Sequence, residues 1–198
     1  MSQSTKIHEA LLNRTEKVSR KSEIVAIITE YKKKFKSSLG IVDGIKYLSR
    51  HRYIRRIFAG FYYVNSRDER TRGYSLYTDK EQIFIVLNRL GIRWYVGLNS
   101  ALYLAGKSWQ VPVVLHLLND SFSGERTILG LKIRFYKIKR SLFVGLTKAK
   151  TTHKVDYYFS NLAKTRLDMV YLKKSHKLIK MPEMKKYLGF YPPWIGKR

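Results

Sequence analysis

The stretch SLGIVDGIKYLSRHRYIRRIFAGFYYV, from Ser38 to Val64, decides the fold. Apolar residues recur at every third position from Leu39 to Leu48, and this period predicts a helix over residues 39–50. The following YIRRIF alternates apolar and basic residues, Gly60 supplies a tight turn, and FYYV returns as a strand, which together predict a β-hairpin. A helix followed by a basic β-hairpin is the order of elements with which a winged-helix domain contacts DNA.

Two further helices are predicted before this stretch, over residues 5–20 and 22–35. Residues 65–78 are polar, rich in turn-forming residues and without periodicity, so they are interpreted as a linker. The domain boundary is placed in this linker. A winged-helix DNA-binding domain is expected over residues 1–72, and a second domain over residues 73–198.

The second half of the sequence predicts a mixed α/β domain, because helical patterns alternate there with apolar, strand-like runs. The predicted helices cover residues 80–91, 96–106 and 161–174, and the predicted strands cover 112–119, 155–159 and one or two segments within 127–140. The fold class is therefore α+β, with an N-terminal winged helix-turn-helix followed by a mixed α/β C-terminal domain. The basic tail from Ser175 is expected to fold against this domain through Tyr187, Phe190, Tyr191 and Trp194.

The charge balance gives the main indication of function. The chain has 40 Lys and Arg residues against 14 Asp and Glu residues, a formal net charge of +26. Residues 81–131 hold only four basic and three acidic residues, so the excess lies at both ends of the chain. Such an excess indicates a polyanionic partner, because Lys and Arg release counterions from phosphates. The alternatives are a basic surface that is merely solvated, an anionic membrane surface and an acidic protein.

Several classes of protein are excluded or disfavoured by what the sequence lacks. It contains no Cys, which excludes disulfides, thiolate catalysis and zinc sites made of Cys. Its apolar stretches are far shorter than the roughly 20 residues of a membrane-spanning helix, and the N-terminus has no apolar signal region. We therefore expect a cytoplasmic protein without a membrane partner.

The candidate DNA contacts form two groups. The helix and wing group comprises Lys46, Tyr47, Arg50, Arg52, Arg55, Arg56, Arg67, Arg70 and Arg72, with Ser38, Asp43 and Ser49 also on the helix. Recognition needs polar side chains that reach base edges, and cations that contact the backbone on either side. Asp43 is an exception, because an acid on this face repels phosphate. The second group comprises Lys132, Arg134, Lys137, Lys139 and Arg140, and it predicts a further basic surface for DNA, RNA or a protein.

No clear catalytic constellation is present, so we expect no enzyme, no cofactor and no metal. The five His residues are scattered, and none forms a pair at helical spacing. His51, next to two Arg residues, is interpreted as a phosphate contact or an exposed side chain. The alternative hypothesis is a metal-dependent nuclease, with Asp120, Glu125 and Lys132 as its candidate residues. The simpler interpretation of the two acids is that they occupy a turn and pair with Arg126.

Several phrases of the sequence resemble a known family, the AbiEi-type abortive-infection antitoxins. The phrases lie within residues 22–172. The matching positions are Arg55, Arg56, Gly60, Tyr62 and Tyr63 in the wing; Tyr95, Gly97, Ser100, Ala101, Leu102 and Gly106 in a central helix; Ile133, Phe135 and Gly145 after it; and residues 163–168 in a last helix. In that helix Ala163 replaces a Glu of the family pattern and Arg166 replaces an apolar residue, which leaves open any pairing made by the Glu.

This resemblance implies a fold and a function. The implied fold is an N-terminal winged helix followed by an α/β domain. The implied role is a transcriptional regulator that binds double-stranded DNA at its own operon promoter, while its second domain neutralises a cognate toxin resembling a nucleotidyltransferase. A homodimer on DNA is compatible with this role, although the sequence contains no zipper.

Overall fold

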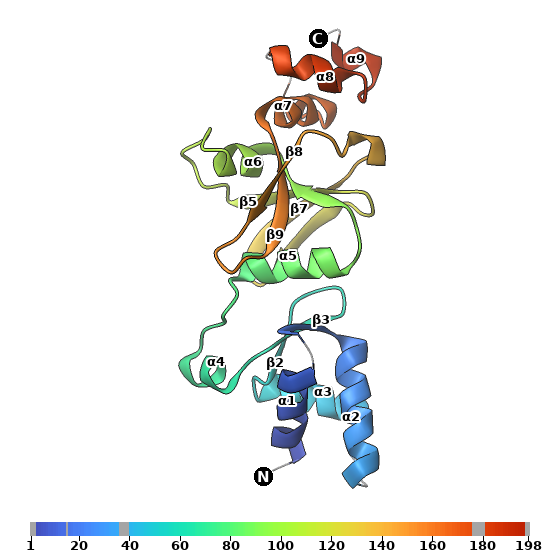
Figure 1. Cartoon of the computed structure of the whole chain (residues 1–198), viewed down its shortest axis with the longest axis vertical. Helices are drawn as coiled ribbons and strands as arrows, with labels where there is room; N and C mark the ends of the chain where they lie inside the picture. Colours follow the sequence, from blue (N-terminus) through green and yellow to red (C-terminus); the bar gives the residue numbers. More distant parts are fainter. Residues whose placement is uncertain (1–2, 15, 36–39, 176–180, 197–198) are drawn as a thin grey trace. The chain divides into compact units, whose positions relative to one another are not determined.

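The computed structural model describes residues 3–14, 16–35, 40–175 and 181–196. It is a mixed α+β protein that divides into two compact units, residues 1–86 and 87–198 (Figure 1). The division falls inside the helix α5 (Asp79–Arg89), whereas the sequence analysis places the domain boundary after residue 72. No helix in the described part of the chain has the length and apolar character needed to cross a membrane.

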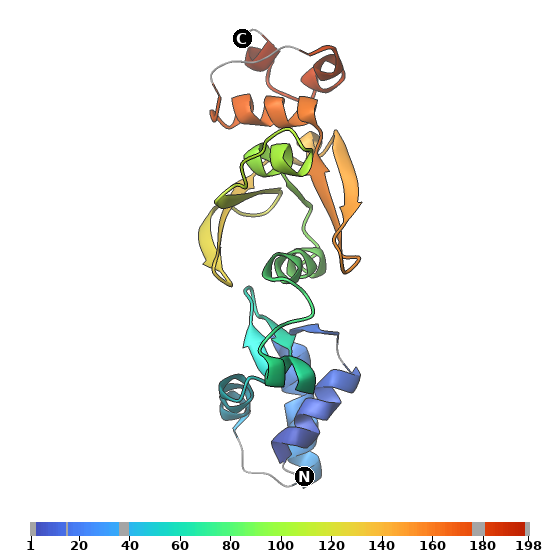
Figure 2. The same cartoon turned by 90° about the vertical axis from the view of Figure 1, so that its left-hand side faces the viewer.

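The first unit combines helices with a small antiparallel sheet of strand order β1-β3-β2. In Figures 1 and 2, the first three helices lie on one side of this sheet. Its elements are α1 (Gln3–Arg14), β1 (Val18–Arg20), α2 (Lys21–Phe35), α3 (Ile41–Arg50), β2 (Ile54–Arg56), β3 (Phe61–Val64), α4 (Arg67–Arg72) and the start of α5. Leu11, Ile24 and Leu48 from the three helices and Ile54 and Val64 from the strands form its buried core.

Most elements of this unit are predicted by the sequence. The helix over residues 22–35 is confirmed, and so is the hairpin, in which Arg55 pairs with Tyr63 across β2 and β3. The helix predicted over residues 5–20 is wrong beyond Arg14, because Val18–Arg20 forms a strand that pairs with β3. Val18 is almost fully buried there, so packing against the sheet outweighs a continuation of the helix.

Two further expectations are corrected. The linker predicted over residues 65–78 contains α4, which the sequence analysis missed. The apolar residues that recur at every third position of α3 are also not all buried. Val42 is 62% exposed, while Ile45 and Leu48 are buried. Ser38 and Leu39 lie outside the described residues.

The second unit is built on a mixed six-stranded sheet of strand order β6-β7-β5-β4-β9-β8. The neighbours β5 and β7 run parallel, as do β4 and β9, and the other pairs are antiparallel. The strands are β4 (Trp94–Val96), β5 (Val114–Asn119), β6 (Gly124–Ile128), β7 (Leu131–Lys137), β8 (Leu146–Lys150) and β9 (Asp156–Ser160). The strands β4 and β8 were not predicted. The helix predicted over residues 96–106 begins only at Leu98, because Val96 pairs with Leu117 of β5. A sheet edge with exposed Lys148 and Lys150 has no apolar signal that would predict β8.

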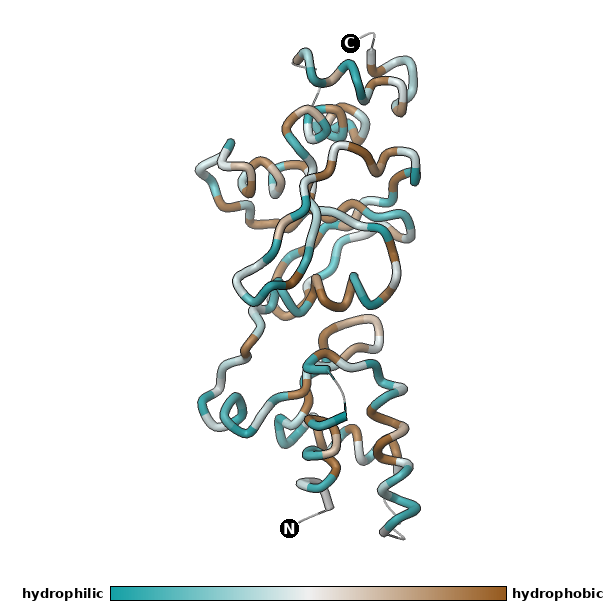
Figure 3. Tube along the Cα trace, viewed as in Figure 1, coloured by the Kyte–Doolittle hydropathy of each residue, from teal (hydrophilic) through white to brown (hydrophobic). Residues whose placement is uncertain are grey.

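The helices α6 (Leu98–Leu104) and α7 (Leu162–Tyr171) pack together in the second unit, with the C-terminal segment against α7. This segment consists of the short helices η2 (Pro182–Met184), α8 (Lys185–Leu188) and α9 (Pro193–Gly196). Tyr187 and Tyr191 are buried as expected, but Phe190 is 47% and Trp194 39% exposed, so the predicted packing holds only in part. Figure 3 shows how apolar and polar positions alternate along these elements.

A buried polar cluster attaches the C-terminal segment to α7. The Lys164 Nζ donates to the Tyr95 hydroxyl at 2.9 Å and to the Tyr191 hydroxyl at 2.6 Å, and it forms an ion pair with Asp168. Tyr95 donates to Asp168 Oδ2 at 2.8 Å. Burial lowers the pKa of Lys164, and the attraction of Asp168 opposes this change. All four side chains are buried, so each polar group depends on the others for its hydrogen bonds.

Candidate nucleic-acid interface

Helix α3 presents one polar face to solvent. Gly44, Ile45 and Leu48 turn inward, and Asp43, Lys46, Tyr47, Ser49 and Arg50 are exposed together with one apolar residue, Val42. Every helix residue that the sequence analysis assigned to DNA, and that the structure describes, is therefore accessible. The Lys46 Nζ lies 3.8 Å from Asp43 Oδ1, so part of its charge is offset by the acid that the sequence marked as unfavourable.

The turn between α3 and β2 holds Arg52 in an unusual backbone conformation. Its φ is 57°, in the left-handed region that favours glycine. The Asn65 Nδ2 donates to the Arg52 carbonyl at 2.8 Å and fixes this turn. A non-glycine residue in this region costs about 1 kcal/mol or more. The side chain of Arg52 is thus kept at the end of α3 despite a local cost.

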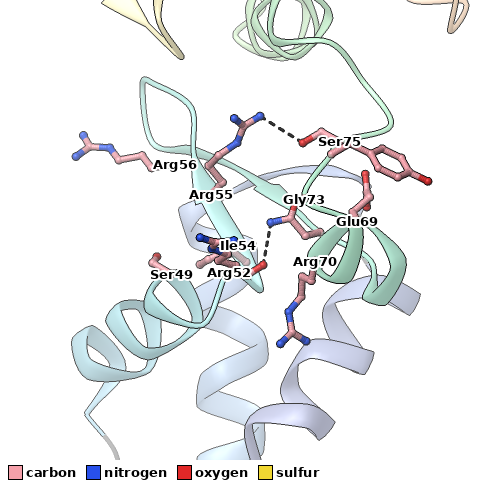
Figure 4. Close-up of a pocket in the computed structure, with 11 residues that line it drawn as sticks. Ser49, Arg52, Ile54, Arg55, Arg56, Glu69, Arg70, Gly73 and Ser75 are labelled. Carbon is pink, nitrogen blue, oxygen red and sulfur yellow. Dashed lines mark hydrogen bonds between the residues drawn. The ribbon is translucent and has the colours of Figure 1, made fainter.

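The two arginines of β2 have different surroundings. The Arg55 Nη2 donates to Asp79 Oδ1 at 2.9 Å, to Gln82 Oε1 at 3.1 Å and to Ser75 Oγ at 3.4 Å. Arg56 is exposed and forms no ion pair with any residue that the structure describes. Figure 4 shows the Arg55 side chain directed toward Ser75, and Arg56 directed elsewhere. Arg55 therefore connects β2 to the start of α5 through a half-exposed pair, and the charge of Arg56 is not offset by an ion pair with any described residue.

Helix α4 carries Arg67, Arg70 and Arg72, the remaining members of the first group. The Arg70 guanidinium lies over the Tyr53 ring, 3.7 Å from its centroid. Arg67 and Arg72 are exposed. Ser66 and Glu69 begin the helix with a reciprocal capping box. The Ser-x-x-Glu pattern was visible in the sequence and could have predicted this helix.

The carboxylate of Glu69 anchors α4 to the rest of the unit. It is buried, forms an ion pair with Lys17, and accepts hydrogen bonds from the Tyr63 hydroxyl and from the backbone N–H of Ser66 and of Leu76. Burial alone would raise its pKa, but these donors together outweigh burial and lower the pKa of Glu69 to about 2. The sequence analysis assigned no role to Glu69 and indicated Tyr63 only as a position of the family resemblance, because their roles depend on residues distant in the chain.

These elements enclose a groove of about 400 Å³ beside the end of α3 (Figure 4). Its lining includes Ser49, Arg52, Arg55, Arg56, Arg70 and Tyr74. The Nε atoms of Arg55 and Arg70 are buried and have no hydrogen-bond partner among the described residues. The structure thus brings together Arg52, Arg55, Arg56 and Arg70, as four arginines around one concave surface.

The second basic group does not form one surface. Along β7, Lys132 and Arg134 lie on one face of the sheet and Lys137 on the opposite face, because side chains alternate along a strand. Arg134 pairs with Glu125 at 2.8 Å, and Arg140 pairs with Asp120 at 2.9 Å. Lys132, Lys137 and Lys139 are exposed. This group is therefore divided between two faces and partly neutralised.

The two acids of the nuclease alternative are engaged in these ion pairs, and its third residue, Lys132, is exposed. Asp120 follows β5 and Glu125 lies in β6, each with its arginine partner, rather than with Arg126. Burial tends to raise the pKa of Asp120, but hydrogen bonds from Ser121 and Arg140 lower it overall. Within the described ranges, no three His, Asp or Glu side chains are grouped so that they could hold a metal ion.

Comparisons with known proteins give no relative. No protein-family model matches this chain, and no curated protein sequence is significantly similar to it.

Proposed function

We propose that this chain is a DNA-binding transcriptional regulator with an N-terminal winged helix. The proposal is supported by the element order α1-β1-α2-α3-β2-β3 and by the sheet order β1-β3-β2. In this interpretation α3 is the recognition helix and the hairpin β2–β3 is the wing. A helix enters the major groove and reads base edges with polar side chains, and α3 offers Lys46, Tyr47, Ser49 and Arg50 for this purpose.

The observation that carries the proposal is the exposed polar face of α3 beside a groove of arginines. Base contacts specify a sequence, and cations next to them bind the phosphate backbone. The tip of the hairpin carries no basic side chain, and its residues Ile57 and Phe58 are buried. The phosphate contacts are therefore assigned to Arg52, which precedes β2, and to Arg56, the last residue of β2, and not to the tip.

The proposal is tested by fluorescence anisotropy with a duplex from upstream of the gene and a shuffled duplex of equal length. We expect tighter binding to the first. Arg50→Ala should reduce this preference, because a specific base contact contributes about 1–3 kcal/mol. Arg166→Ala, at an arginine of the second unit, is the control. Equal affinity of the wild type for both duplexes, or no binding to either, would contradict the proposal.

The proposed role has a second part, in which the second unit neutralises a toxin resembling a nucleotidyltransferase, so that the chain regulates its own operon as an antitoxin. The loop between α6 and β5 supports a protein partner here. Trp109 is 87% exposed, Val113 83% and Val111 68%, and Lys107 is the only charged residue within residues 94–119. An exposed apolar group with so little charge favours a protein over a phosphate.

The second part is tested with a nucleotidyltransferase-like protein encoded beside the gene. We expect a stable complex of the two purified proteins, and Trp109→Ala should weaken it by about 10-fold or more, as expected for a Trp at the centre of an interface. Phe190→Ala, at an exposed aromatic residue elsewhere in the unit, is the control. The absence of a complex would contradict this part and leave DNA binding unaffected.

A further inference from the structure

A second hollow, of about 250 Å³, lies between the α3–β2 turn and α4. It is lined by His51, Arg52, Arg67, Arg70 and Thr71. The lining thus contains three guanidinium groups, an imidazole and a hydroxyl, and none of the lining residues carries a carboxylate. Like charges so close together repel one another, and this repulsion is relieved when an anion binds among them.

The three arginines around this hollow are not neutralised, and each is held at its backbone or its side chain. Arg70 is fixed by its stacking on Tyr53, and the backbone of Arg52 is fixed by the side chain of Asn65. Thr71 donates to the Arg67 carbonyl at 3.0 Å, within the capped helix α4. Over the residues that the structure describes, Arg52, Arg67 and Arg70 take part in no ion pair. The guanidinium of Arg70 and the backbones of Arg52 and Arg67 are thus held, and the three charges remain available.

Neither acid of α4 neutralises these arginines. Asp68 is exposed and forms no ion pair with any described residue. Glu69 lies in the same helix and lines the neighbouring groove, but its carboxylate is buried and already accepts hydrogen bonds from Lys17 and Tyr63. It is therefore not available to pair with Arg67 or Arg70. The carboxylate that anchors α4 is already engaged, and it leaves Arg67 and Arg70 without a counter-ion.

We propose that this hollow binds one backbone phosphate of duplex DNA, next to the base pairs that α3 reads. The inference rests on the proposed function and adds the site that sets the position of the strand. Guanidinium groups suit a phosphate because their planar N–H donors match its oxygens in pairs. Such a contact is independent of sequence, so it supplies affinity and fixes the orientation of α3 without supplying specificity.

The conformation of Arg52 offers a clean substitution. Glycine adopts a φ of 57° more readily than arginine does. Arg52→Gly therefore removes the side chain without adding backbone strain. We expect Arg52→Gly to leave the protein as stable as the wild type or more stable, and to weaken binding to every duplex by about 3-fold or more.

The direct test compares two arginines of the same helix, Arg67→Ala and Arg72→Ala. Both remove one exposed positive charge from α4, but only Arg67 lines the hollow. Anisotropy titrations against salt, with the upstream and shuffled duplexes, should show that Arg67→Ala lowers the affinity for both about equally. The salt slope should fall by about 1. Arg72→Ala should leave the slope near that of the wild type.

A second arm separates a backbone phosphate from a free one. Inorganic phosphate alone should raise the melting temperature of the wild type at most slightly and equally for both variants, because the site is built for a phosphate held within a duplex. A strong rise that only Arg67→Ala abolishes would overturn the proposal in favour of a free-phosphate site. Equal salt slopes for Arg67→Ala and Arg72→Ala would also overturn it.

The outcomes also distinguish this inference from the proposed function. If the wild type prefers the upstream duplex but Arg67→Ala and Arg72→Ala behave alike, the phosphate site is wrong and the regulator proposal stands. If the wild type binds both duplexes equally and Arg67→Ala alone lowers the salt slope, the phosphate site stands and sequence-specific regulation is contradicted.

Discussion

The guanidinium group of Arg70 lies 3.7 Å from the centroid of the Tyr53 ring, so an aromatic side chain of the α3–β2 turn directs a cation of α4. Arg70 lines both the groove and the neighbouring hollow. The stacking therefore connects the packing of the first unit to the place where we expect phosphate to bind. A cation over a ring contributes about 0.5–2 kcal/mol, depending on how far it is desolvated.

The first prediction concerns this pair. Tyr53→Leu should weaken binding to duplex DNA by about 3-fold, because Arg70 loses the ring that positions it. Tyr53→Phe keeps the ring and should retain the affinity of the wild type. Anisotropy titrations on folded samples measure both. Loss of affinity in the Phe variant would show that the ring is not the relevant feature.

The second prediction separates the two arginines of β2. Arg55→Ala should lower the free energy of unfolding by about 1 kcal/mol, because Asp79 loses its partner in a half-exposed pair. Arg56→Ala should leave stability within about 0.5 kcal/mol and should weaken binding to all duplexes. Urea unfolding and anisotropy give the two quantities. The reverse assignment, with Arg55 needed for binding and Arg56 for stability, would refute this distinction.

The third prediction concerns the pH dependence of stability. The pKa of Glu69 is about 2 in the folded protein, against an ordinary value of 4.5. Its contribution is therefore fully present above about pH 4.5 and is lost as the pH falls toward 2. At pH 7, Glu69→Gln should cost on the order of 3 kcal/mol.

The control for this prediction is Asp68→Asn, at an exposed acid of the same helix. This substitution should change the free energy of unfolding very little at every pH. Urea unfolding of the wild type and of Glu69→Gln should give free energies that converge as the pH is lowered from 4.5 toward 2. A difference that stays constant over this range would mean that the charge of Glu69 does not contribute.

The fourth prediction concerns the buried cluster of the second unit. Lys164→Met leaves the carboxylate of Asp168 buried without its cation, and Asp168→Leu leaves the ammonium of Lys164 buried without its anion. Each should cost about 3–5 kcal/mol in urea unfolding. The double variant removes both charges and should recover much of this loss. Strict additivity of the two single effects would show that the pair is not coupled.

Much of the fold could be predicted from the sequence, because periodicity reports which face of an element is buried. Helix α2 and the hairpin β2–β3 show this. The strands β1 and β8 could not be predicted, since a three-residue strand and an exposed edge strand depend on their neighbours for hydrogen bonds. Helix α4 was missed, although the Ser-x-x-Glu pattern of its capping box, Ser66 to Glu69, can be recognised in the sequence.

For the candidate site, the sequence predicts which basic residues are present but not how they are arranged. The sequence shows seven arginines between residues 50 and 72, but it does not show that Arg55 pairs with Asp79 or that Arg70 stacks on Tyr53. These roles are set by contacts between separate elements. The left-handed conformation of Arg52 likewise depends on the turn that Asn65 closes.

The central claim is that α3 reads DNA sequence, and the most direct measurement is selection of binding sites from a pool of random duplexes. The wild type is expected to enrich a defined motif. Lys46→Ala combined with Arg50→Ala should abolish this enrichment while the protein stays folded, since both side chains lie on the exposed face of α3. A pool that remains random with the wild type, or the same motif with the double variant, would contradict the claim.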